Sequence, residues 1–180
     1  HIFTYKEGGR HVPVTLKHQL EGQVPSIKKK YLKYSAYKTQ MLEDIFEPNQ
    51  LRNAVMQEAN FFQSAVLINE GNGKFKVQEL PRMAQRSWMY TSLVADINGD
   101  GHQDIVMGGN LKGAKPEVGQ YDASYGEILL GKGDGTFTYW HNRDHGLQLH
   151  GDIRDLQLVS IKGQRLLMVL KNNEGVEFWE

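Results

Sequence analysis

The sequence predicts a mainly β protein, a partial β-propeller of about two to three antiparallel blades with a short α-helical insertion. Runs rich in β-branched and aromatic residues alternate with Gly/Asn/Asp turns, and a hairpin pattern that ends in phenylalanine recurs along the chain. Self-similarity at roughly 40–60 residues, built from hairpins, is typical of propeller blades. We expect a single unit over residues 1–180, with a β-hairpin at 1–20, helices at 26–56 and β repeats at 60–180.

The first segment predicts a hairpin. The short runs Ile2–Tyr5 and His11–Leu16 flank the turn signal Lys6–Arg10, which contains two glycines. Pro13 cannot donate a hydrogen bond to a neighbouring strand. We therefore expect the second strand to lie at a sheet edge or to carry a bulge.

Residues 26–56 change to a helical pattern. Ser26 and Ser35 are suitable helix caps, and Pro48 suits the first turn of a helix. Three short helices are expected, over residues 27–34, 36–46 and 48–55. The segment is interpreted as a helical insertion that packs on a β body.

The internal repeat is clearest in two hairpins. Leu67–Phe75 aligns with Leu129–Phe137, and more loosely with Lys171–Phe178 near the end of the chain. The equivalent phenylalanines lie at 75, 137 and 178, so the intervals are 62 and 41 residues. The longer interval contains the stretch 108–126, and a loop of this length inside a compact repeat is often functional.

Four residues of that stretch are candidates for ligand contact. Two tyrosines stand beside a carboxylate and a hydroxyl, a combination that suits a glycan or a peptide. These residues are Tyr121, Asp122, Ser124 and Tyr125. The alternative is a loop that packs on itself.

Residues 96–104 have the composition of a calcium loop. Oxygen-bearing side chains stand at alternate positions between two apolar runs, and glycines at 99 and 101 allow a tight turn. Calcium prefers such oxygens, together with main-chain carbonyls. The candidate ligands are Asp96, Asn98, Asp100, the carbonyl of His102, and Asp104. Met107 occupies the twelfth position, where an EF-hand needs glutamate, so an EF-hand is excluded. The alternative is a polar, glycine-rich hairpin that binds no metal.

This strand–loop–strand resembles the VCBS and FG-GAP repeats of integrin-like β-propellers. The segments that carry the resemblance are Glu58–Asn60, the calcium loop, Gly108–Asn110, Gln120–Ser124 and Leu129–Gly131. Together they resemble the C-terminal portion of a large secreted repeat protein of the Bacteroidetes type. The resemblance implies an extracytoplasmic location (periplasm or cell surface), Ca²⁺ at the five loop residues and a binding role rather than catalysis.

A closed propeller has about four to eight blades, whereas this sequence contains roughly two and a half. We therefore expect the chain to be a piece of a longer parent, or its ring to be completed by a second copy. The chain begins with His1, so we expect its native start, and any signal peptide, to be missing.

Composition narrows the function classes further. Lys plus Arg equals Asp plus Glu, so no basic surface for nucleic acid is indicated. Cysteine is absent, which excludes thiolate chemistry, and no apolar run is long enough for membrane insertion. No hydrolase, zinc-protease or phosphate-loop motif occurs.

We expect a non-catalytic, calcium-stabilised extracellular β-repeat module that binds a glycan or a cell-surface protein. One alternative is the propeller portion of a carbohydrate-active enzyme, such as a polysaccharide lyase, with its catalytic residues outside this chain. The other is a zinc or acid–base site in the histidine- and aspartate-rich segment 141–155. That site would use His141, Asp144, His145, His150, Asp152 and Asp155. A polar connection between hairpins explains this segment more simply.

Overall fold

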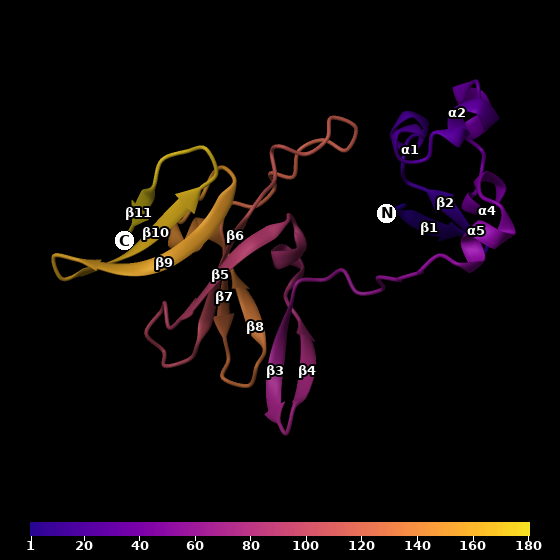
Figure 1. Cartoon of the computed structure of the whole chain (residues 1–180). Coiled ribbons are helices and arrows are strands. Elements are labelled where there is room, and N and C mark those ends of the chain that lie inside the picture. The colour runs from indigo at the N-terminus through magenta and orange to yellow at the C-terminus, as the bar shows by residue number, and fades with distance from the viewer. The chain divides into compact units, whose positions relative to one another are not determined.

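The structure is a computed structural model that describes residues 1–180, and its contacts divide the chain into two compact units (Figure 1). The units are His1–Asn60 and Phe61–Glu180. The sequence predicts a single unit with a helical insertion, and the division differs from that expectation because the first unit buries a core of its own. This core consists of Leu20, Ile27, Tyr31, Tyr37 and Ile45. None of the helices is long and apolar enough to cross a membrane.

The first unit begins with the predicted hairpin, in which β1 (Thr4–Glu7) pairs antiparallel with β2 (Arg10–Pro13). Both strands are edges of a two-stranded ribbon, as Pro13 requires. The hairpin expected over residues 1–20 ends earlier than predicted, because the residues after Leu16 form the helix α1 (Lys17–Gln23). The helix directs Leu20 into the core, where it is fully buried.

Four further helices follow: α2 (Ser26–Lys30), α3 (Tyr34–Tyr37), α4 (Leu42–Ile45) and α5 (Pro48–Arg52). The helix expected over residues 36–46 is broken in two. The break is at Met41, whose backbone is extended (φ −85°, ψ 165°) and whose amide donates a hydrogen bond to the Asp44 side chain (3.0 Å), so that α4 begins there. Ser35 lies inside α3 and does not cap it.

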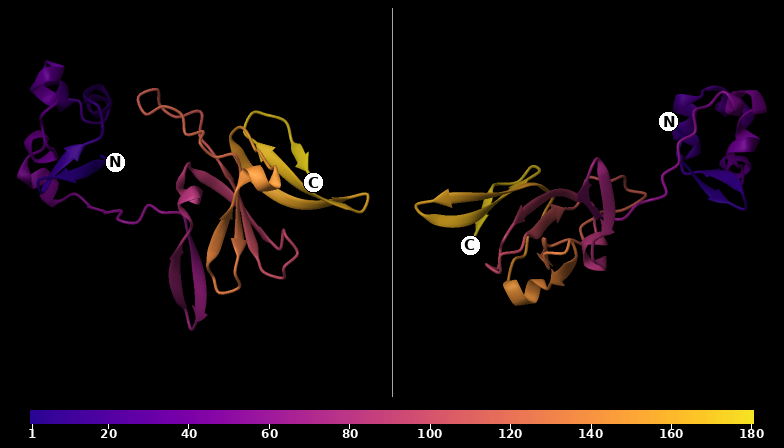
Figure 2. Two further views of the ribbon diagram at one scale, coloured as in Figure 1. Left: turned by 180° about the vertical axis from the view of Figure 1, so that it is seen from behind. Right: turned by 90° about the horizontal axis from the view of Figure 1, so that it is seen from below.

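The second unit is mainly β, as the sequence predicts, and consists of three antiparallel sheets (Figures 1 and 2). The first sheet is a two-stranded hairpin of β3 (Ala65–Gly71) and β4 (Lys74–Glu79). The middle sheet has four strands, in the order β5 (Met89–Ala95), β6 (Asp104–Gly109), β7 (Glu127–Gly131) and β8 (Phe137–Trp140). The last has three, β9 (Ile153–Ile161), β10 (Gln164–Lys171) and β11 (Glu177–Trp179). The short helices are η1 (Arg82–Gln85) and α6 (Asn142–His145).

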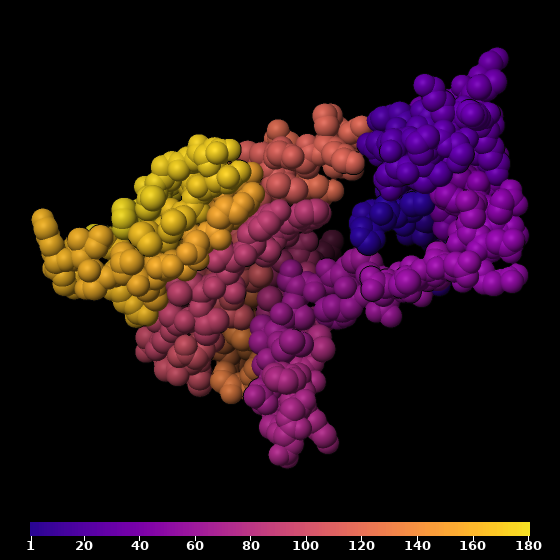
Figure 3. All heavy atoms as spheres, viewed as in Figure 1, coloured from indigo at the N-terminus to yellow at the C-terminus, as the bar shows by residue number.

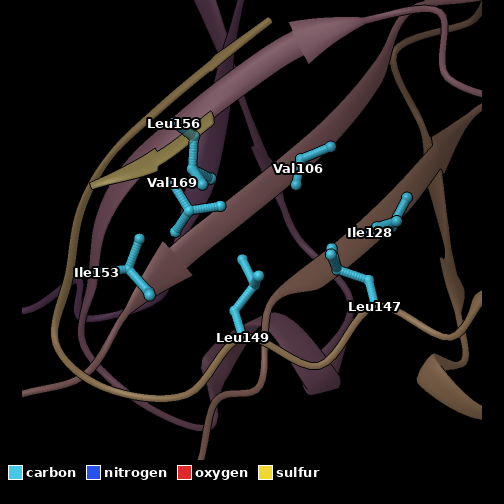
Figure 4. Close-up of a cluster of buried hydrophobic side chains, with 7 residues drawn as sticks. All are labelled: Val106, Ile128, Leu147, Leu149, Ile153, Leu156 and Val169. Carbon is cyan, nitrogen blue, oxygen red and sulfur yellow. The ribbon is translucent and has the colours of Figure 1, made fainter. Parts of the chain in front are cut away.

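The middle sheet is buried on both faces. Successive residues of β6 point to opposite faces, and all three of Ile105, Val106 and Met107 are buried. One face packs with the last sheet in a cluster of Val106, Ile128, Leu147, Leu149, Ile153, Leu156 and Val169 (Figure 4). The other face packs with the β3–β4 hairpin and η1 in a cluster of Leu80, Ala84, Ile105, Met107 and Leu129.

Candidate functional site

The candidate calcium loop connects β5 to β6 and is folded by its own side chains. The Asp96 carboxylate accepts hydrogen bonds from the amides of Gly99 (2.7 Å) and Gly101 (3.0 Å). Both glycines have positive φ, +78° and +88°, which other residues rarely adopt. The Asp100 carboxylate accepts hydrogen bonds from the His102 amide (2.8 Å) and the Asn98 side-chain amide (2.9 Å). The acidic residues therefore fix the loop conformation directly.

Asp104 has a different environment. Its side chain is 0% exposed, and its two oxygens accept hydrogen bonds from the amides of Ile97 and Gly131, each at 2.9 Å. Position 131 must be glycine, because a Cβ there would lie 2.1 Å from the carbonyl oxygen of Gln103. Asp104 therefore connects the start of the loop to the end of β7, a role that the sequence analysis does not identify.

The donor set suits a hard cation in its chemistry. Asn98, Asp100 and His102 are exposed, and Asp96 is half-buried. The hydrogen bond from Asn98, followed by that from the His102 amide, lowers the pKa of Asp100 below its usual value. This loop therefore offers an ionised carboxylate and an amide oxygen to solvent. Ligation by Asp104 stays a prediction, because its side chain is 0% exposed, whereas Asp100 is exposed and Asp96 half-buried.

The chain contains no group of three or more His, Cys, Asp or Glu side chains arranged to hold a metal ion. The candidate ligands that fit the cation best are Asp96, Asn98 and Asp100, which share one short loop. Asn98 and a main-chain carbonyl are neutral oxygen donors of the kind that calcium accepts.

The predicted ligand loop joins β6 to β7 at the opposite end of the middle sheet, because consecutive antiparallel connections alternate between ends. Asn110 anchors it. The Asn110 side chain is buried, donates to the carbonyls of Ser124 (2.8 Å) and Gly151 (3.1 Å), and accepts from the Ser124 amide (3.1 Å). Ser124 is 1% exposed. It therefore holds the loop in place and does not present its hydroxyl to solvent, contrary to the expectation.

An aromatic surface lies at this end. Trp88 is 53% exposed and stacks on Tyr121, with ring centroids 5.2 Å apart and planes 24° from parallel. The Ser87 hydroxyl donates to the Tyr121 carbonyl (3.2 Å). Asp122 is exposed, and Tyr125, 44% exposed, contacts the ring of His150 edge-on. Three of the four predicted ligand-loop residues are therefore accessible.

Trp88 is the functional candidate that the sequence analysis misses. It lies more than thirty positions from the predicted loop residues, and only strand pairing brings it to them. Met89 pairs with Gly109, and the Asn110 amide donates to the Trp88 carbonyl (2.8 Å). The one signal in the sequence is a tryptophan directly before the residues that form β5.

The alternative site at residues 141–155 does not assemble. The rings of His141, His145 and His150 each pack edge-on against a different aromatic ring. Asp152 accepts a hydrogen bond from the Lys112 amide (2.9 Å) and pairs with Arg154 (3.3 Å). These residues stabilise the connection between the middle and last sheets.

Glu127 is a buried carboxyl that no sequence signal identified. It is 1% exposed, and no hydrogen bond of good geometry reaches either carboxyl oxygen, although Tyr139 and Ser124 lie beside it and partly favour its ionised form. The neighbouring Tyr139 hydroxyl donates to Asn142 Oδ1 (2.5 Å). Burial raises the pKa of Glu127, and burial followed by the neighbouring Glu127 raises the pKa of Tyr139 to about 12.

Comparison of the chain with protein-family models, with curated proteins and with solved structures finds no significant match. The resemblance to VCBS and FG-GAP repeats therefore stays a prediction.

Proposed function

We propose that the second unit is a non-catalytic β module in which calcium stabilises one end of the middle sheet and the other end binds an extracellular glycan. The observation that carries the proposal is that the two ends of the middle sheet present different kinds of side chain. Oxygen-bearing side chains gather at the β5–β6 loop, and accessible aromatic rings gather beside the β6–β7 loop. Calcium acts structurally here, since it lies away from the ligand.

The calcium ligands in this proposal are Asp96, Asn98, Asp100 and the His102 carbonyl, with Asp104 as the fifth candidate. The ion supplies positive charge between carboxylates that otherwise repel one another. Extracellular calcium modules commonly have Kd values of about 10⁻⁴–10⁻³ M. A site of this affinity is filled at the calcium concentration outside cells, so the proposal includes an extracytoplasmic location.

Calcium should raise the melting temperature of the second unit. At ten times its Kd, the ion adds about 1.4 kcal/mol to the free energy of unfolding. Asp100→Ala should abolish this calcium-dependent rise, because it removes an ionised ligand while leaving the buried bonds of Asp104 intact. Thermal melts in calcium, in magnesium and in chelator measure the effect.

The matched control is Asp134→Ala, which removes an exposed turn aspartate in the neighbouring β7–β8 hairpin. This variant should keep the calcium response of the wild type. A wild-type melt that is identical in calcium and chelator would exclude the calcium proposal.

The glycan proposal depends on Trp88 and Tyr121. Stacked aromatic rings with polar neighbours offer an apolar face and hydrogen bonds together, as a sugar ring requires. Asp122 is exposed beside Tyr121 and supplies a hydrogen-bond acceptor. These features favour a saccharide over an extended protein surface.

Trp88→Ala should weaken glycan binding by about 30-fold, because truncating a central aromatic residue commonly costs about 2 kcal/mol. An oligosaccharide array identifies a binding sugar, and calorimetry compares wild type with variant. Phe62→Ala is the control, since Phe62 is 81% exposed and lies outside the middle sheet. An equal loss of glycan affinity in both variants, or no loss of affinity in Trp88→Ala, would contradict the proposal that the aromatic surface binds the glycan.

A further inference from the structure

A cleft of about 430 Å³ lies in the second unit, beside the predicted ligand loop. Its volume falls within the range of about 300–1,000 Å³ that is typical of small-molecule sites. The cleft is lined by Gln148, His150, Glu177, Phe178 and Trp179. Tyr125 of the ligand loop contacts the ring of His150 edge-on, with centroids 5.2 Å apart, and its carbonyl accepts a hydrogen bond from the Leu149 amide (2.7 Å). The cleft is therefore at the same end of the middle sheet as the aromatic surface.

One wall of the cleft is the segment between α6 and β9, in which burial alternates along the chain. Leu147 and Leu149 are buried and point into the core cluster (Figure 4). The residues that follow each of them, Gln148 and His150, are exposed. The two leucines therefore fix the segment, and its polar side chains are left to line the cleft.

The other wall is β11, the edge strand of the last sheet. Phe178 is 50% exposed and Trp179 is half-buried. Figure 3 shows the C-terminal residues, in yellow, at the surface of the second unit. The indole N–H of Trp179 donates a hydrogen bond to Glu177 Oε2 (3.3 Å), and the Lys171 ammonium donates one to Glu177 Oε1. These two bonds hold the Glu177 carboxylate in one orientation.

The charges beside the cleft are paired. The Lys171 side chain is 3% exposed and lies behind Glu177, whose side chain is 41% exposed. The hydrogen bond from Lys171 lowers the pKa of Glu177 below its usual value, so this carboxylate is ionised at neutral pH. Glu174, which also lies near Lys171 (3.9 Å), pairs with Lys112 (3.6 Å). The cleft therefore offers an ionised hydrogen-bond acceptor whose charge is already balanced.

This arrangement distinguishes between classes of ligand. A cation would find no unpaired carboxylate, and an anion would place its charge beside Glu177 and Glu174, which repel it. A neutral hydroxyl group, in contrast, donates a good hydrogen bond to a fixed carboxylate. The rings of Phe178 and Trp179 supply the apolar surface that a sugar ring also needs. An uncharged, hydroxyl-rich ligand fits the cleft best.

We propose that this cleft is a second saccharide-binding site and that it takes uncharged sugars. Glu177 accepts hydrogen bonds from sugar hydroxyls, Gln148 donates one to a sugar oxygen, and Phe178 packs against the apolar face of the ring. This inference rests on the proposed glycan-binding function. It adds to that function a second contact site and a preference for neutral over acidic sugars.

The test is calorimetric titration of the full chain with cellohexaose, mannohexaose and maltohexaose, and with their counterparts oxidised to uronates at the primary hydroxyl. Wild type should bind a neutral sugar of this panel, and its uronate counterpart at least about ten-fold more weakly. Phe178→Ala should weaken binding of the neutral sugar by about ten-fold. Gln148→Ala, an exposed substitution that keeps the test valid if Phe178→Ala does not fold, should weaken it by about three-fold.

Phe75→Ala is the control, because Phe75 is 58% exposed but belongs to the β3–β4 hairpin. It should bind the neutral sugar as wild type does. If Trp88→Ala loses affinity while Phe178→Ala and Gln148→Ala bind normally, the proposed glycan function stands and the second site is wrong. If only the two cleft variants lose affinity, the second site stands and the role proposed for Trp88 is wrong. A wild type that binds none of the neutral sugars, or binds the uronates equally well, would overturn the inference.

Discussion

Asp104→Ala should lower the free energy of unfolding of the second unit by about 3 kcal/mol or more. The substitution removes two charge-assisted hydrogen bonds, each worth about 1.5–3 kcal/mol. It also leaves the amides of Ile97 and Gly131 without their partner. Denaturant unfolding followed by tryptophan fluorescence measures the loss, because all three tryptophans lie in the second unit, at 88, 140 and 179.

Two comparisons separate this structural role from calcium binding. Asp104→Asn keeps one carbonyl oxygen and should lose about half as much stability. The loss in Asp104→Ala should persist in chelator, because the amide bonds need no cation. If the variant and wild type were equally stable in chelator, Asp104 would act only as a calcium ligand, and the structural interpretation would be wrong.

Glu127→Gln should stabilise the second unit by about 1–3 kcal/mol at a pH above the raised pKa of Glu127, because it replaces a carboxyl whose ionised form is disfavoured by burial. The raised pKa of Glu127 determines the direction in which the stability changes with pH. The protonated form is favoured in the folded state, so its stabilising contribution is complete below the usual pKa of 4.5 and is lost as pH rises through the folded value.

The stability difference between Glu127→Gln and wild type should therefore grow as pH rises from about 4.5 through the raised folded pKa of Glu127. Tyr139 does not titrate in this range, since its pKa is about 12. Denaturant unfolding across the range provides the measurement. Glu117→Gln makes the same change on an exposed loop and should leave the profile unchanged. A difference that is independent of pH would mean that folding does not raise the pKa of Glu127, and this interpretation would be wrong.

The strands were the most predictable part of the molecule. The turns at Gly71–Gly73 and Gly133–Gly135 place glycines between apolar runs, and a hairpin forms at each. Such hairpins can be predicted from the local sequence, because the turn type and the alternation of apolar and polar residues determine which residues of the two strands pair. The helix expected over 36–46 is wrong because Met41 has an extended backbone where Asp44 caps α4, and the helical spacing of the apolar residues does not reveal such a break.

The candidate site was predictable only where its residues are neighbours in sequence. The spacing of Asp96, Asn98 and Asp100 identifies an oxygen-rich loop without any structure. The partner of Asp104 in β7 and the position of Trp88 beside Tyr121 both depend on pairing between distant strands. Single-sequence periodicity carries no information about such pairing.

The placement of the two loops at opposite ends of one sheet has an evolutionary consequence. The last sheet has only a Lys162–Gly163 turn between β9 and β10, at the end that corresponds to the oxygen-rich loop. Its other end is still held to the middle sheet, through the bonds of Asn110 to Gly151 and of Asp152 to Lys112. One end can therefore lose or gain a cation loop by mutation while the other end keeps its surface. Sheets connected in this way can change the residues at one end without changing those at the other.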